Sequence, residues 1–109
     1  MHDKTLNLYP DGKKSFEEFV TEKAPADKAY EHNLVAVYWL TQVADVEAAT
    51  SDQIYSCYRS VSWKLPHDLR NSLSQTASHK GWLDTKDADD IKITPQGLNF
   101  VERQLPQKR

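Results

Sequence analysis

The chain has one cysteine and three glycines in 109 residues, and it has no long apolar run. The single cysteine, Cys57, excludes an internal disulfide and fits a reducing compartment. No apolar stretch approaches the roughly 20 residues that a membrane-spanning helix needs. The start, Met-His-Asp-Lys, leads into no signal-peptide core. We therefore expect a cytoplasmic protein that does not associate with a membrane.

The patterns that usually carry chemistry are also missing. Gly12, Gly81 and Gly97 are isolated from one another, so no glycine-rich loop could cradle a phosphate. The four histidines share no zinc-ligand spacing with each other or with Cys57, and no Ser-His-Asp order accompanies a nucleophile turn. Cys57 lies in a predicted helix without a basic neighbour, which favours a buried, inert thiol. We expect no enzymatic activity, no cofactor and no bound metal.

What the chain does contain is an ordinary globular composition, with 39% hydrophobic and 28% charged residues. Its length suits one domain with one modest core. The net charge of −2 is unevenly spread: residues 50–80 are slightly basic, whereas residues 81–93 hold four aspartates against two lysines. A dedicated DNA-binding protein usually has a stronger basic face than this.

Two helices are predicted in the first half of the chain. Ser15 with Glu18 forms a capping-box pattern, and the apolar residues that follow predict a helix over residues 15–23. A second helix is expected from a cap at Asp27 to about Val43. Its centre, residues 34–40, is apolar on every face, so other elements or a second copy of the chain must cover it. The first helix is expected to pack on this centre.

Further signals divide the second half. Thr50-Ser51-Asp52 predicts a helix start. Pro66 predicts the start of another helix that runs to Lys80 and ends at Gly81. Short strands are expected at residues 82–83 and 91–93, and Thr94-Pro95 begins a last helix whose buried residues are Leu98, Val101 and Leu105. The predicted organisation is a loosely ordered segment at residues 1–14, one domain at 15–105 and a tail at 106–109.

From about residue 27 to residue 105, this order of elements resembles the winged helix-turn-helix superfamily. The match lies in Gly81-Trp82-Leu83 and in residues 91–97, "IKITPQG", which are similar to the end of bacterial transcription regulators of this type. The resemblance implies a mainly α (α+β) fold: a three-helix core, a short two-stranded antiparallel wing hairpin and flanking N- and C-terminal helices. Winged helices also serve as protein-docking modules, so the motif is more specific for fold than for function.

In that family, the helix before the wing enters the major groove of DNA, which implies this role for residues 66–80. Arginine can bridge guanine, and asparagine or glutamine can pair with adenine, while lysines at the two ends could bind phosphates. The resemblance therefore implies a nucleic-acid-binding set of eight residues: Lys64, His67, Arg70, Asn71, Ser74, Gln75, Ser78 and Lys80. The same face could equally be an ordinary solvated helix surface.

The wing departs from the pattern of DNA-binding relatives, whose wing tips are basic. Four carboxylates stand between the two predicted strands: Asp84, Asp87, Asp89 and Asp90. Such a tip would be repelled by phosphate, which moves any DNA contact onto the preceding helix. Two hypotheses follow, a module that binds duplex DNA, with a possible homodimer, or an adaptor that docks another protein through its acidic wing.

Overall fold

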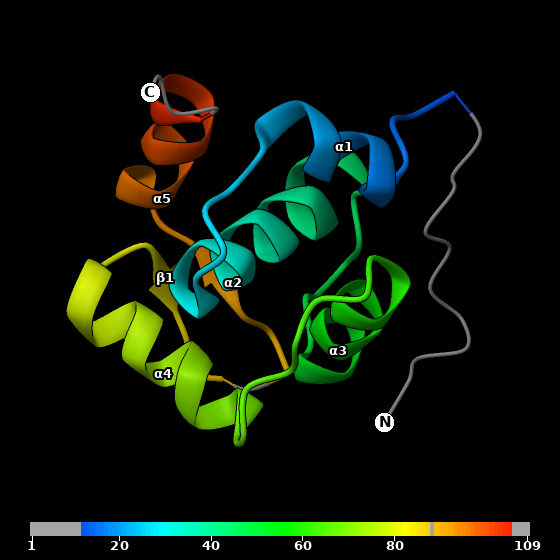
Figure 1. The fold of residues 1–109 in the computed structure, drawn as a ribbon. Coiled ribbons are helices and arrows are strands. Elements are labelled where there is room, and N and C mark those ends of the chain that lie inside the picture. Colours follow the sequence, from blue (N-terminus) through cyan, green and yellow to red (C-terminus); the bar gives the residue numbers. More distant parts are fainter. Residues whose placement is uncertain (1–11, 88, 106–109) are drawn as a thin grey trace.

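Five α-helices and a small antiparallel sheet make up the part of the chain that the computed structural model describes, residues 12–87 and 89–105 (Figure 1). The fold is therefore mainly helical, as expected. Residues 1–11 and 106–109, which hold most of the predicted terminal segment and the whole predicted tail, lie outside the described residues. Within these ranges, no helix is long and apolar enough to cross a membrane.

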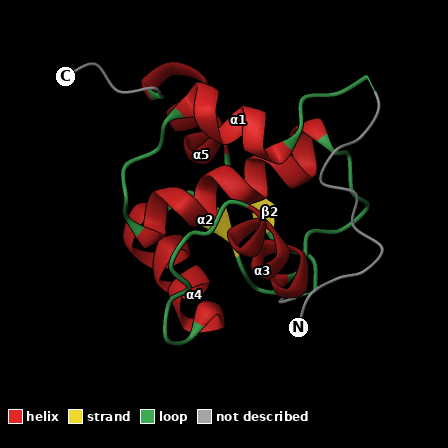
Figure 2. Cartoon of the chain, turned by 45° about the vertical axis from the view of Figure 1, so that its right-hand side comes forward, coloured by secondary structure: helices red, strands yellow, loops and turns green. Residues whose placement is uncertain are grey.

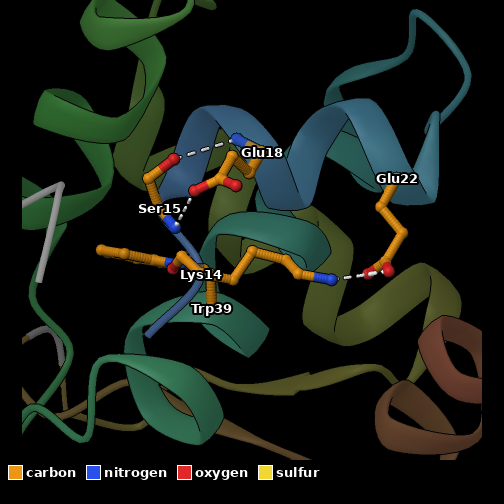
Figure 3. Close-up of polar contacts among 5 residues, drawn as sticks. All are labelled: Lys14, Ser15, Glu18, Glu22 and Trp39. Carbon is orange, nitrogen blue, oxygen red and sulfur yellow. Dashed lines mark hydrogen bonds and ion pairs between the residues drawn. The ribbon is translucent and has the colours of Figure 1, made fainter. Parts of the chain in front are cut away.

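Helix α1, Phe16–Lys23, begins at the predicted capping box. The Ser15 hydroxyl accepts a hydrogen bond from the Glu18 amide at 3.1 Å, and the Glu18 carboxylate accepts one from the Ser15 amide at 3.2 Å (Figure 3). These two bonds satisfy amides that the first turn of a helix leaves without partners. The helix ends at Ala24, which adopts a left-handed conformation with φ 43°. The prediction of this helix is confirmed.

Helix α2, Ala29–Tyr38, crosses the middle of the molecule and continues into a wider π-helical turn, η1, Trp39–Val43 (Figures 1 and 2). The prediction that Asp27 caps this helix is wrong: the N-cap is Lys28, which makes no side-chain capping bond. Asp27 instead lies with its carboxylate 3.7 Å from Nε2 of His32. Because the helix begins one residue later than expected, Asp27 precedes the N-cap position and its carboxylate is fully exposed.

The apolar centre of α2 is covered on all sides by the same chain. Residues 31–37 are all buried, and α2 contacts α3, α4, α5 and β2. Helix α1 covers a further side, where Phe16 meets Trp39 edge to face at 5.5 Å and Phe19 stacks on Tyr38 at 5.4 Å. The packing of α1 on this helix is thus confirmed. The apolar centre needs no second copy of the chain, so it no longer argues for a dimer.

Helix α3, Ser51–Ser60, starts as predicted, because Thr50 and Gln53 form a second capping box. Helix α4, Leu69–Lys80, starts three residues later than the predicted Pro66. Asp68 is its N-cap and accepts a bond from the Asn71 amide at 3.2 Å. A capping carboxylate satisfies a free amide, which proline at the first position cannot do, and Asp68 therefore sets the start. Gly81 ends α4 at φ 68°, as predicted.

The hairpin at the position of the expected wing consists of β1, Leu83–Asp84, and β2, Lys92–Ile93, paired antiparallel with Leu83 opposite Ile93. The predicted strands, 82–83 and 91–93, differ from these by one residue. Ile91 leaves the hairpin and pairs with Ala49, whose carbonyl accepts the Ile91 amide at 2.8 Å. This isolated bridge ties the hairpin to the loop that leads into α3.

The chain closes with α5, Pro95–Asn99, and a π-helical turn, η2, Phe100–Gln104. Thr94 caps α5 as predicted by accepting the Gly97 amide at 3.2 Å. Val101 and Leu105 are buried, as expected, and Leu98 is half-buried. Gly97 makes this turn possible, since a methyl group there would lie 2.4 Å from the Trp82 carbonyl oxygen.

Candidate nucleic-acid interface

Helix α4 has two faces of different character. Ser72, Leu73 and Thr76 are buried against the rest of the domain. All the residues predicted to contact nucleic acid are exposed: Lys64, His67, Arg70, Asn71, Ser74, Gln75, Ser78 and Lys80. Six of the eight lie on α4. Lys64 precedes the helix as predicted, and His67 also lies in the loop before it because the helix starts later than predicted. The structure therefore places all eight residues on α4 and on the loop that precedes it.

A buried polar network holds the inner face of α4 in place. Asn33 of α2 donates hydrogen bonds from its amide nitrogen to the hydroxyls of Ser72 and Thr76, both at 3.0 Å. Its amide oxygen accepts a bond from the Tyr58 hydroxyl of α3 at 2.7 Å. One fully buried side chain thus joins three helices, and every one of these buried polar groups has a partner.

The N-terminal end of α4 borders an open cleft of about 370 Å³ that it shares with the start of α3. Its walls combine acidic and basic groups with hydroxyls and one apolar residue: Ser51, Asp52, Tyr55, His67, Asp68, Leu69 and Arg70. Asp68 is committed to capping α4. In the described part of the chain, Arg70 takes part in no ion pair, so its guanidinium remains available to a ligand.

The C-terminal end of α4 is surrounded by aromatic rings. The ammonium nitrogen of Lys80 lies 5.7 Å from the ring centroids of both Tyr30 and Trp82. The Tyr30 hydroxyl is hydrogen-bonded to Nδ1 of His79 at 3.2 Å. Trp82 in turn packs on Phe100 with 4.4 Å between ring centroids. The predicted phosphate-binding lysine is therefore held by residues from two other elements.

The acidic wing is organised by its own carboxylates. Asp84 accepts the Lys86 amide at 3.1 Å, and Asp87 accepts the Asp89 amide at 2.9 Å. Both are bonds of an aspartate side chain to the backbone two residues on, the pattern that shapes a tight turn. Asp90 lies 3.8 Å from the ammonium of Lys92. Three of the four predicted interaction residues therefore have bonds or ion pairs within the hairpin, and Asp89 is exposed.

A cluster of aromatic rings supports the loop that leads into α4. Trp63 stacks on His32 at 3.9 Å and meets Tyr58 edge to face at 5.3 Å. Burial lowers the pKa of His32, although the carboxylates of Asp27 and Glu31 act in the opposite direction. Of the three tryptophans, Trp39 is fully buried, while Trp63 and Trp82 are half-buried.

Other titratable groups lie inside the core. Cys57 is fully buried, as predicted, and burial raises the pKa of its thiol well above the ordinary range, which keeps it protonated and unreactive. Burial likewise raises the pKa of Tyr58. Tyr58 is completely buried, so its ring is not available for stacking on a ligand. In the described ranges, no three His, Cys, Asp or Glu side chains gather as a metal site.

Sequence reasoning missed the residues that position α4. Asn33 is the strongest of these, and its signal was a lone amide next to the apolar run of residues 34–40. A polar side chain beside such a run must find partners once it is buried. Tyr30 gave no local signal, because its contacts with His79 and Lys80 depend on how α2 and α4 cross.

Compared with protein-family models, curated proteins and solved structures, the chain matches none of them. We therefore assign the roles of its residues from their chemistry and geometry.

Proposed function

We propose that this chain is a non-enzymatic winged-helix module that binds duplex DNA through the exposed face of α4. The order of elements, three helices and a hairpin followed by a last helix, supports the winged-helix interpretation. The observation that carries the function is the division of α4 into a locked inner face and an exposed polar outer face. A rigid helix with such an outer face suits the width of the major groove.

The outer face offers the groups that such binding requires. Arg70 can donate two bonds to guanine, and Asn71 or Gln75 can pair with adenine. Ser74 and Ser78 are small, which allows a close approach, and the Ser78 hydroxyl is bonded back to the Ser74 carbonyl at 3.2 Å. Lys64 and Lys80 lie near opposite ends of the helix, where phosphates on either side of the groove would be met.

The test is a titration of isotope-labelled protein with random-sequence duplex at low salt, followed by amide NMR signals. We expect the amides of residues 64–80 to shift, with smaller changes on α1. Arg70→Ala or Asn71→Ala should lower the affinity for a selected site by about tenfold, the typical effect of losing one bidentate base contact. Absence of any shift in residues 64–80 would reject DNA binding.

Two matched variants control for the loss of the same side chains elsewhere. Arg103 and Asn99 are both exposed, and they lie on η2 and α5, outside the proposed DNA-binding residues 64–80. Arg103→Ala and Asn99→Ala should leave the affinity within about twofold of the wild type, because neither faces the groove. An equal loss in both pairs would show that charge or stability, not the α4 face, explains the effect.

A second candidate is a protein-interaction adaptor, and the exposed carboxylates of Asp87 and Asp89 at the wing tip favour it. A basic partner would form ion pairs with them, and its binding would not be affected by Arg70→Ala. Asp87→Asn and Asp89→Asn would weaken such a complex. If affinity capture finds a partner that these asparagine variants lose while Arg70→Ala retains it, and duplex causes no shifts, the adaptor is the better account.

Homodimerisation stays a separate proposal. The apolar residues 34–40 that suggested it are mostly buried within one chain. A dimer would therefore have to use other surfaces. Such a dimer could place its two α4 helices in successive major grooves of one duplex. Light scattering at high protein concentration decides the matter, and a monomer mass rejects the dimer.

A further inference from the structure

The C-terminal end of α4 carries a cluster of two basic and two aromatic side chains from α4, from α2 and from the segment before β1. Lys80 and His79 come from α4, Tyr30 comes from α2, and Trp82 directly precedes β1. Both basic residues are exposed, whereas both aromatic residues are half-buried. We call these four residues the Tyr30–Trp82 cluster. They bring together two N–H donors, the Lys80 ammonium and the His79 ring, and two aromatic rings at the edge of the proposed DNA-binding face.

The two rings fix the position of the lysine ammonium. Lysine is flexible, and a ligand that binds it usually has to immobilise its whole side chain. Here the ammonium already lies 5.7 Å from each of two ring centroids, within the range of cation–π attraction. The rings occupy no N–H donor, so the ammonium can still donate to a ligand. The C-terminal end of a helix also favours a positive charge.

His79 is the second donor. When the Tyr30 hydroxyl donates to Nδ1, the proton of the neutral imidazole lies on Nε2, which then becomes a donor directed away from Tyr30. Throughout residues 12–87 and 89–105, no acidic side chain forms an ion pair with His79 or Lys80. The cluster therefore keeps its positive character and presents adjacent donors.

We propose that the Tyr30–Trp82 cluster binds a backbone phosphate of the duplex, beyond the bases that α4 reads; this inference rests on the proposed DNA binding. Lys80 and His79 are the phosphate ligands, whereas Tyr30 and Trp82 are positioning residues. The ligand is a phosphodiester and not a stacked base, because one side of Trp82 is packed on Phe100 and both rings lie beside Lys80. The cluster adjoins the α4 face through His79, which lies four residues after the exposed Gln75 and therefore on the same side of the helix.

The experiment measures binding of a short random-sequence duplex by fluorescence anisotropy between about 50 and 200 mM salt. Each phosphate contact contributes to the slope of log affinity against log salt concentration. Lys80→Ala should reduce that slope by about 0.9 and lower the affinity by about fivefold at the lowest salt. Lys80→Arg should restore most of the slope. Lys23→Ala, a lysine at the end of α1, is the matched control and should leave the slope unchanged.

Tyr30→Phe separates positioning from packing, since it removes only the hydroxyl and keeps the ring beside Lys80. We expect a loss of about twofold in affinity with the salt slope retained, and no further loss in a His79→Ala background. Tyr38→Phe is the control on the same helix, because it also loses a hydroxyl bond, the one to Glu102 at 2.9 Å. It should leave DNA affinity unchanged.

The possible outcomes distinguish this inference from the proposed function. If duplex shifts the amides of α4 but Lys80→Ala keeps the wild-type salt slope, the phosphate site is overturned and DNA binding stands. If Tyr30→Phe lowers affinity equally in the His79→Ala background, Tyr30 is not the positioning residue. If duplex leaves the α4 amides unmoved, DNA binding fails and the phosphate site fails with it.

Discussion

Helix α4 and the wing loop that follows it are both rich in polar side chains, but those side chains are bonded in different ways. In α4, the inner polar groups bond to residues far away in the chain, as Ser72 and Thr76 do to Asn33. In the wing, Asp84 and Asp87 bond to amides two residues on. The first pattern places a helix within the domain, and the second only shapes a turn.

The difference changes the meaning of the acidic wing. Four carboxylates in a row of seven residues suggest a docking patch, but two of them have a structural role as turn formers. Apart from His79 and Lys80, which contact Tyr30 and Trp82, the exposed polar residues of α4 have no such structural role. Counting charges along the sequence therefore overstates the ligand-binding character of the wing and understates that of α4.

The largest loss of stability is expected when the buried hydrogen bonds that hold α4 are removed. Asn33→Ala removes three hydrogen bonds and leaves buried hydroxyls unpaired, so it should lower the free energy of unfolding by about 3 to 4 kcal/mol. Asn71→Ala, on the exposed face of the same region, should change it by less than about 0.5 kcal/mol. Urea unfolding measures both. Similar values for the two variants would contradict the role of the network.

The anchorage of the hairpin gives the next effect. Gly97→Ala would place a methyl group 2.4 Å from the Trp82 carbonyl oxygen and 2.9 Å from Ile93 Cγ1. We expect a loss of about 2 to 3 kcal/mol in thermal or urea unfolding, because backbone must move to relieve the contact. Gly81→Ala should cost only about 1 kcal/mol, the strain of a left-handed alanine, since its methyl group meets a flexible end of Gln96. Reversal of this order would contradict the packing at Gly97.

The limits of the helices and strands differ in how far they could be predicted from the sequence. Helix starts at Ser15, Thr50 and Thr94 and the stop at Gly81 were predictable, because each depends on bonds between residues at most four apart. The start of α4 was not, since Pro66 and Asp68 are competing signals and only the structure shows which one caps the helix. The strand limits were off by one residue because nothing local revealed the pairing of Ala49 with Ile91.

The candidate site divides in the same way. Helical spacing was enough to separate the exposed residues of α4 from Leu73 and Thr76. The partners of those residues were beyond reach, because Asn33 is separated from Thr76 by 43 positions and Tyr30 from His79 by 49. Contacts of this kind depend on the crossing of α2 and α4, which local patterns do not encode.

A pH dependence is expected on the loop side of α4, where His32 stacks on Trp63. Burial lowers the pKa of His32 from its ordinary value of 6.5, so the unfolded chain takes up the proton first. At pH values well above 6.5, His32 is neutral in both the folded and the unfolded chain and makes no such contribution to the free energy of unfolding. Stability should decrease as the pH falls below 6.5 and level off below the lowered pKa. Urea unfolding of wild type and His32→Phe over this range measures it. An unchanged pH slope in the variant would assign the effect to other groups.

The smallest effect on stability is expected from the wing. Asparagine can accept the same amide bond as aspartate, so Asp84→Asn with Asp87→Asn should keep the turn and change stability by less than about 0.5 kcal/mol. Removing two negative charges should raise the affinity for random duplex by about two- to fivefold at low salt, because less repulsion remains. Anisotropy titrations measure this. Unchanged affinity would show that the wing stays away from the phosphates.

The position of Phe16 has a consequence for the time course of synthesis. Phe16 is completely buried between Trp39 and Trp63, at 5.5 and 5.6 Å from their rings. It leaves the ribosome before either partner, and at roughly 5 to 20 residues per second Trp63 follows on the order of 2 to 10 seconds later. During that interval, the packing around Phe16 is incomplete, because Trp39 emerges well before Trp63. The early chain is therefore the part that a chaperone would protect.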